Sequence, residues 1–202
     1  MISVASERFD KAIAAIDVAN ADDPEAIIVR GARRPKEQAH AELMTERVLE
    51  LDPDADEAQL LAARAHHLRR WSIPRSSFPE GRAGYLRWRT TLNRQHASEV
   101  GSILAAAGYD DATSERVQRI IRKEGLKADA AVQTHEDALC LVFLETQLLE
   151  LVDRLGDDRV VDVIAKTLRK MSRRAIDVAL GLPLDERSRA DVVRAVEVVE
   201  AP

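Results

Sequence analysis

Apolar residues along most of this chain recur every three to four positions, which is the spacing of one face of an α-helix. Short stretches rich in Asp, Gly or Pro separate the periodic segments. The pattern predicts helices over residues 6–20, 35–51, 57–71, 85–107, 111–125, 133–150, 157–180 and 185–200. We therefore expect an all-α, single-domain bundle of about seven to eight helices within residues 1–202, with its core over 6–156 and packing helices over 157–200.

The most apolar segment, ALCLVFLETQLLELV, directly follows Asp137. A helix that is apolar on nearly all sides belongs at the centre of a bundle. Glu136 and Asp137 lie on its first turns, where the helix dipole alone stabilises a carboxylate. The same carboxylates could instead serve as a metal ligand or a general base.

Histidines lie on the apolar faces of three predicted helices. His40 and His96 each share a stripe with core residues, while the adjacent His66 and His67 lie about 100° apart around their helix. A buried imidazole needs a polar partner, and singly each is ordinarily a hydrogen-bonded core residue. Together with Asp137 they form a donor set that suits Mn, Fe, Co or Zn.

Residues 62–94 gather eight arginines and both tryptophans around a single acid, Glu80. A guanidinium group can donate two parallel hydrogen bonds to two oxygens of a phosphate, so this stretch predicts a site for a small anionic ligand. The alternative is an ordinary solvated face, with aromatic rings that seat the loop rather than stack on a base. The candidate substrate-binding residues are Arg70, Trp71, Arg75, Arg82, Tyr85, Trp88 and Arg89.

The composition narrows the classes of partner. Hydrophobic residues make up 46% and charged residues 32%, which is typical of a globular chain rather than a disordered one. The net charge of −5 argues against nonspecific binding of duplex nucleic acid. The single cysteine, Cys140, cannot form an internal disulfide, and no segment predicts a signal peptide or a membrane span. We expect a cytoplasmic protein without a membrane partner.

The order of the candidate ligands resembles that of the HD-domain metal-dependent phosphohydrolases. In that resemblance His40 matches the first His, His66-His67 the second element, His96 an auxiliary His and Asp137 the final Asp. One departure is that His67, and not an Asp, follows His66. The resemblance implies an HD-domain-like fold and a divalent metal held by His40, His66 or His67, and Asp137.

A longer resemblance covers about residues 9–151. The strings HLRRWSIPRSSFP, RAGYLRWRTTLNRQHA and QTHEDALCLVFLE are similar to the family named domain of unknown function 4202. That family is all-helical, and its name implies no reaction.

These observations leave three functional hypotheses open. The first is an HD-like phosphohydrolase for a small phosphorylated substrate, such as a nucleotide, with metal on His40, His66, His67 and Asp137 and with Glu136 and His96 as catalytic residues. The second is a non-catalytic phosphate- or nucleotide-binding module with a degenerate HD site. The third is a scaffold whose valine-rich last helix forms a homodimer.

Overall fold

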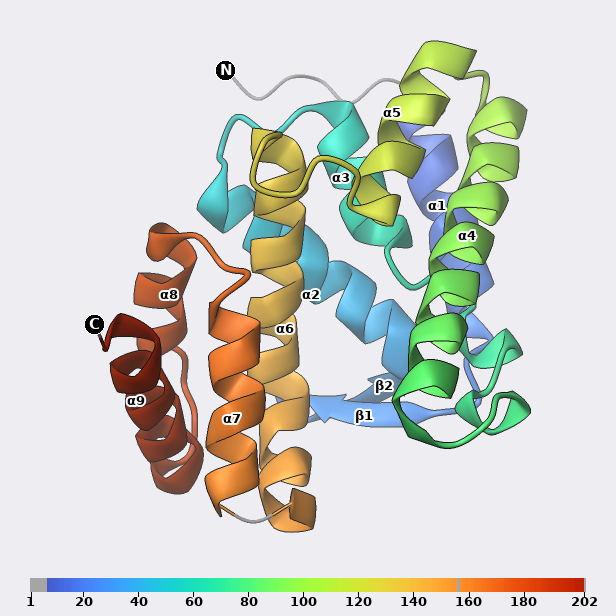
Figure 1. Cartoon of the computed structure of the whole chain (residues 1–202). Coiled ribbons are helices and arrows are strands. Elements are labelled where there is room, and N and C mark those ends of the chain that lie inside the picture. Colours follow the sequence, from blue (N-terminus) through green and yellow to red (C-terminus); the bar gives the residue numbers. More distant parts are fainter. Residues whose placement is uncertain (1–6, 156, 202) are drawn as a thin grey trace.

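The computed structural model of the protein describes residues 7–155 and 157–201, and it is built almost entirely of α-helices (Figure 1). The prediction of an all-α fold is therefore confirmed. The predicted helix start at residue 6 and the predicted end of the core at residue 156 lie outside the described residues. Helices α1 to α9 span Glu7–Ala21, Lys36–Leu51, Glu57–Ala65, Gly81–Ala107, Asp111–Arg122, Ala130–Leu155, Asp157–Leu168, Arg173–Leu180 and Glu186–Glu200.

A short β-hairpin lies between α1 and α2, where the sequence predicts only a loop. Strands β1 (Ala26–Val29) and β2 (Ala32–Pro35) pair in antiparallel fashion. The turn residues Arg30 and Gly31 have φ angles of 51° and 78°, as a two-residue hairpin turn with two left-handed positions requires. Strands of four residues are too short to produce a clear alternation, so the periodicity did not reveal them.

Helix α3 ends earlier than predicted, at Ala65. The chain then turns, with Arg69 in the left-handed conformation at a φ of 49°, and enters the 3₁₀ turns η1 (Arg70–Ser72) and η2 (Arg75–Ser77). The Arg69 N–H donates to Asn20 Oδ1 at 3.1 Å, and His96 Nδ1 donates to the Leu68 carbonyl at 2.8 Å. Contacts from α1 and α4 thus hold the turn, and the local sequence does not encode them.

The helix predicted over 157–180 is wrong, because the chain breaks into α7 and α8. Ser172 is the N-cap of α8, and its Oγ accepts from the Ala175 N–H at 3.2 Å. Two hydrogen bonds from α6 stabilise the chain between α7 and α8. Asp137 Oδ1 accepts from the Ser172 N–H at 2.8 Å, and Gln133 Nε2 donates to the Lys170 carbonyl at 2.9 Å.

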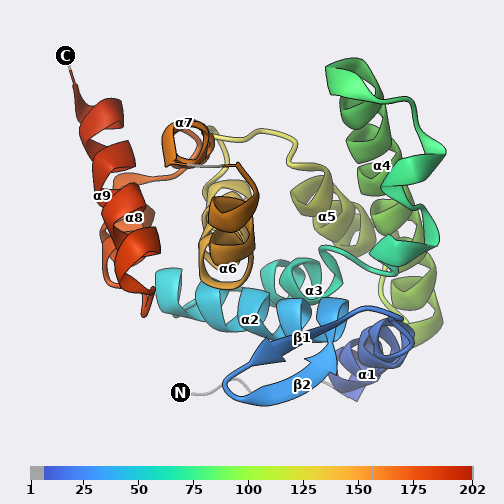
Figure 2. The ribbon, with the colours of Figure 1, turned by 90° about the horizontal axis from the view of Figure 1, so that it is seen from below.

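Helix α6 runs through the middle of the molecule, as its all-round apolar character predicts (Figures 1 and 2). Seen nearly end-on in Figure 2, it separates α7, α8 and α9 from α3, α4 and α5, while α2 crosses beside it. One hydrophobic cluster joins α6 to α2 and to α7–α9, and its fully buried side chains include Leu141, Leu144 and Leu148. A second cluster joins α1, α3, α4 and α5. Within the described residues, no helix is both long and apolar enough to cross a membrane.

Candidate functional site: a buried histidine–carboxylate cluster

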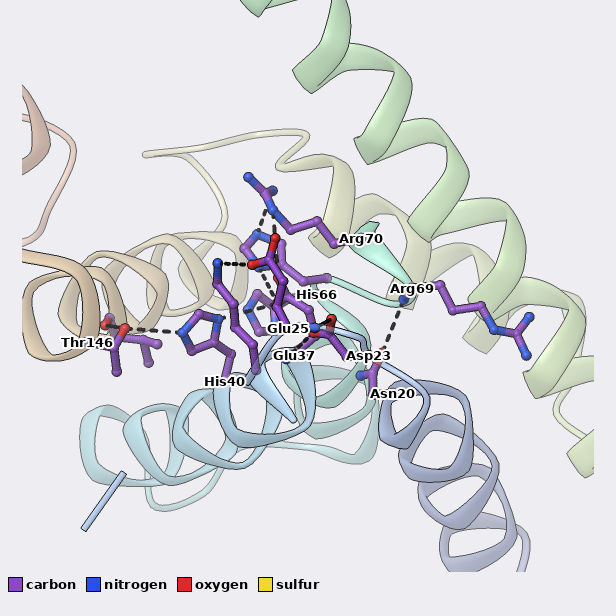
Figure 3. Close-up of polar contacts among 12 residues, drawn as sticks. Asn20, Asp23, Glu25, Glu37, His40, His66, Arg69, Arg70 and Thr146 are labelled. Atoms are coloured by element: carbon purple, nitrogen blue, oxygen red, sulfur yellow. Dashed lines mark hydrogen bonds and ion pairs between the residues drawn. The ribbon is translucent and has the colours of Figure 1, made fainter. Parts of the chain in front are cut away.

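A buried carboxylate on the first turn of α2, Glu37, organises a cluster of polar side chains (Figure 3). Its Oε2 lies 3.1 Å from His67 Nδ1 and 3.3 Å from His40 Nδ1. Its Oε1 lies 3.7 Å from Arg70 Nε, and its backbone N–H donates to Asp23 Oδ2 at 2.9 Å. Glu37 is only 4% exposed, so these partners replace the water that would otherwise solvate it.

The charge of Glu37 is maintained by its neighbours. Burial acts to raise the pKa of this carboxyl, but the facing imidazoles of His67 and His40 outweigh it and hold the pKa well below its ordinary value. Arg70 supplies the balancing positive charge. The carboxylate is therefore ionised at neutral pH and available to a cation.

Four imidazoles crowd the same region. The His67 ring centroid lies 4.1 Å from that of His66 and 5.9 Å from that of His96, and the centroids of His66 and His135 are 6.5 Å apart. Burial lowers the pKa of His67 and His135 to about 3, that of His96 to about 4, and that of His66 well below its ordinary value. All four rings are neutral at pH 7, and each keeps a nitrogen lone pair.

Two of these lone pairs have a fixed position. His66 Nδ1 donates to the Ala63 carbonyl at 3.0 Å and His96 Nδ1 to the Leu68 carbonyl, so the lone pair of each ring is on Nε2. In the part of the chain that the structure describes, both Nε2 atoms are buried without a hydrogen-bond partner, as is His135 Nδ1. A ring that donates one N–H to a backbone carbonyl and presents the other nitrogen is the arrangement of metal-binding histidines.

The donor atoms of Glu37, His66 and His67 lie within 4.8 Å of one another, which makes them a candidate metal-binding group. One carboxylate oxygen and two neutral imidazole nitrogens suit Zn, Mn, Fe or Co. The unpartnered His66 Nε2 supports the fit, because a buried acceptor without a partner is otherwise costly. Three protein ligands would leave a position for water or substrate.

A cavity of about 20 Å³ opens beside these rings. That volume holds roughly one water molecule or ion, not a substrate. Its wall carries three cationic side chains, Arg70, Arg89 and Lys123, together with Asn93. The cavity therefore favours an anionic group at its mouth.

The structure brings two of the predicted substrate-binding arginines to this cavity. The guanidinium of Arg70 lies over the Trp88 ring at 4.7 Å, and that of Arg89 lies 5.9 Å from the Tyr85 ring centroid. Trp88 Nε1 donates to the Ile73 carbonyl at 2.8 Å, so Trp88 also holds the loop before α4 in place. This is the structural role that the alternative interpretation of the aromatic residues predicts. Tyr85 is 43% exposed.

The other predicted substrate-binding residues lie away from the cavity lining. Arg75 donates to the carbonyls of residues 78 and 79, at 2.9 and 3.0 Å, and so stabilises its own loop. Arg82 is exposed at the start of α4, and Trp71 is half-buried in η1.

The two α6 carboxylates predicted to belong to the site, Glu136 and Asp137, have partners other than the histidine cluster. Asp137 is predicted to bind metal, but its carboxylate accepts hydrogen bonds from Gln133 and from the Ser172 N–H, and it is not part of the Glu37 donor group. Glu136 is buried and forms an ion pair with Lys123, with Lys170 Nζ at 3.8 Å. The rotation of α6 thus directs Asp137 towards the α7–α8 turn.

The predicted residues His40 and His96 border the donor group rather than join it. His40 lies between Glu37 and Thr146, with Nε2 3.2 Å from Thr146 Oγ1. His96 packs beside His67 and holds the turn after α3 through Leu68. Both positions suit residues that orient the ligands.

Glu37 is the functional candidate that sequence reasoning missed. A signal was available, because Glu37-Gln38-Ala39-His40 places a carboxylate and an imidazole on one helix face, a spacing that some metal-binding bundles use. No local signal points to His135 or Lys123, which reach the cavity only through the packing of α5 and α6.

The fold and the cluster together define an all-α protein with a buried histidine–carboxylate group where α2, the turn after α3, α4 and α6 meet. The family model described as domain of unknown function (DUF4202) matches residues 10–192, and the chain belongs to this family. No curated protein and no solved structure matched the chain. The resemblance to HD-domain phosphohydrolases therefore stays a prediction.

Proposed function

We propose that this protein is a metal-dependent phosphohydrolase that acts on a small phosphorylated substrate, such as a nucleotide. The observation that carries the proposal is the donor group of Glu37, His66 and His67 beside a cavity walled by Arg70, Arg89 and Lys123. The ligands for a cation, one ionised carboxylate and two neutral imidazoles, lie next to positive charges for an anion, and hydrolysis of a phosphate ester needs both.

The residues of the donor group have separate parts in this proposal. Glu37, His66 Nε2 and His67 would hold the metal, which when bound polarises the phosphoryl group and lowers the pKa of a coordinated water. His40 and the Ala63 carbonyl fix the orientation of Glu37 and His66. Keeping these side chains rigid keeps the ligand atoms in one geometry as substrates enter and leave.

The cationic wall would bind the phosphate. Arg89 and Arg70 offer paired N–H donors, and Lys123 adds a point charge that Glu136 holds in place. Because the cavity admits about one water or ion, the organic part of the substrate stays outside, near the exposed Tyr85 ring.

Elemental analysis together with a hydrolysis panel of phosphate esters and nucleotides tests the proposal. We expect about one metal ion per chain and metal-dependent turnover, with metal and activity both lost in Glu37→Gln and His66→Gln. Asp137→Asn is the matched control: it removes a buried carboxylate outside the donor group and should keep the metal. A wild-type protein that takes up none of Mn, Fe, Co or Zn and turns over no substrate would refute the proposal.

The cationic wall by itself favours a second candidate, a phosphate-binding module without catalysis. Phosphate would then raise the melting temperature equally with and without a chelator, by mass action on the folded state. A requirement for metal in that shift would exclude this alternative.

The homodimer and the cytoplasmic location stay predictions. Val193 and Val198 on α9 are 42% and 50% exposed, so an interface there is open to test. Sedimentation of the full chain beside a Val193→Ser, Val198→Ser variant would show whether these side chains join two copies.

A further inference from the structure

Arg70 occupies the place next to the donor group that a bound cation would need. Its Nη1 lies 3.4 Å from His67 Nε2, and its Nε lies 3.7 Å from Glu37 Oε1. Its guanidinium also lies over the Trp88 ring, and the Arg70 side chain, which lines the cavity, is 31% exposed. Figure 3 shows Arg70 beside Glu37.

The two atoms that Arg70 faces are the donor atoms of Glu37 and His67 that the contact between these two residues leaves unused. Glu37 Oε2 is already shared by His40 and His67, which leaves Oε1 on the side of Arg70. A guanidinium can only donate, so the His67 nitrogen beside it, Nε2, carries the lone pair. A metal that binds Glu37 and His67 through these atoms would meet Arg70.

Arg70 is held loosely there. Both of its contacts are longer than a charge-assisted hydrogen bond of 2.7–2.9 Å. By contrast Arg64, six residues earlier, makes a two-point pair with Asp17 at 2.6 and 2.8 Å. Two cations so close together in a buried site repel strongly, so a metal and the Arg70 guanidinium cannot share Glu37 and His67.

We propose that Arg70 is an exchangeable cation: metal binding to Glu37, His66 and His67 displaces its guanidinium, which then binds the phosphate of the substrate. This inference rests on the proposed metal centre. It implies that Arg70 opposes metal binding when phosphate is absent and favours it when phosphate is present, because the displaced guanidinium then gains a partner. Such coupling is reciprocal between the two ligands.

Titration calorimetry with Mn²⁺, with and without inorganic phosphate, tests the exchange. The proteins are the wild type, Arg70→Met, Arg70→Gln and, as a control, Arg87→Met, which removes an exposed arginine of α4 that does not line the cavity. Without phosphate, both Arg70 variants should bind Mn²⁺ about tenfold or more tightly than the wild type, since a nearby like charge is gone. Phosphate should tighten Mn²⁺ binding in the wild type and in Arg87→Met, and much less in the Arg70 variants.

The outcomes separate the two proposals. If the wild type binds Mn²⁺ and the folded Arg70 variants bind it equally or more weakly, the exchange is refuted but the proposed metal centre is not. Mn²⁺ binding by the Arg70 variants but not by the wild type supports the exchange. No binding by any protein, with circular dichroism showing each to be folded, overturns the metal centre and the exchange with it.

Discussion

His135 offers a direct test of the reasoning about buried neutral imidazoles. Its ring lies inside the molecule, its Nδ1 has no hydrogen-bond partner among the described residues, and burial lowers its pKa to about 3. An unfolded histidine has a pKa of about 6.5. Between these two values the unfolded state binds the proton and the folded state does not, so the free energy of unfolding falls as the pH drops below about 6.5 and stops falling near the folded pKa.

The size of the effect follows from the two pKa values. At pH 5 an unfolded His135 is almost fully protonated and the folded one almost fully neutral, which destabilises the folded state by about 2 kcal/mol relative to high pH. His135→Leu removes that contribution and places a side chain of similar size, which does not titrate, at the same position. We therefore expect the stability difference between variant and wild type to shift by about 2 kcal/mol in favour of the variant from pH 7.5 to pH 5.

Urea denaturation at the two pH values, in EDTA to remove metal, measures this shift. Arg87→Met, which replaces an exposed side chain of α4, serves as the control and should follow the wild type at both pH values. A stability difference for His135→Leu that stays constant between pH 7.5 and pH 5 would refute the claim that His135 is buried in its neutral form.

Two further predictions concern the surroundings of the site. Lys123→Met leaves the buried Glu136 carboxylate with only the more distant Lys170, at 3.8 Å, as an ion-pair partner, and should lower the free energy of unfolding by about 3 kcal/mol. The double variant with Glu136→Gln should recover much of the loss; urea denaturation of the four proteins in a double-mutant cycle checks this, and additive losses would contradict it. Gly84→Ala should destabilise the fold by about 2 kcal/mol and alter tryptophan fluorescence, because the added Cβ overlaps the Pro79 carbonyl oxygen. Gly181→Ala is the control and should leave the fluorescence unchanged, because Gly181 has a φ of −89° and the added Cβ lies at an ordinary contact distance of 3.4 Å from the Val178 carbonyl oxygen.

The sequence by itself determined most of the helical architecture. Apolar side chains at helical spacing specify which segments become helices, and an all-round apolar segment specifies that α6 lies in the middle. It also indicated that His40 and His96 point inward, because each shares a stripe with core residues. These properties are local, since one helix turn is enough to set which side chains share a face.

Tertiary structure decided the composition of the candidate site. Glu37 lies on the first turn of α2 and Asp137 about two turns into α6, and the sequence favoured Asp137 as the metal ligand. The rotation of α6 directs Asp137 to the Ser172 N–H, while the place where α3 ends brings His66 and His67 beside Glu37. Helix rotation and helix ends of this kind depend on contacts between residues far apart in the chain, such as those of Asn20 and the Leu68 carbonyl, and periodicity along the sequence does not encode them.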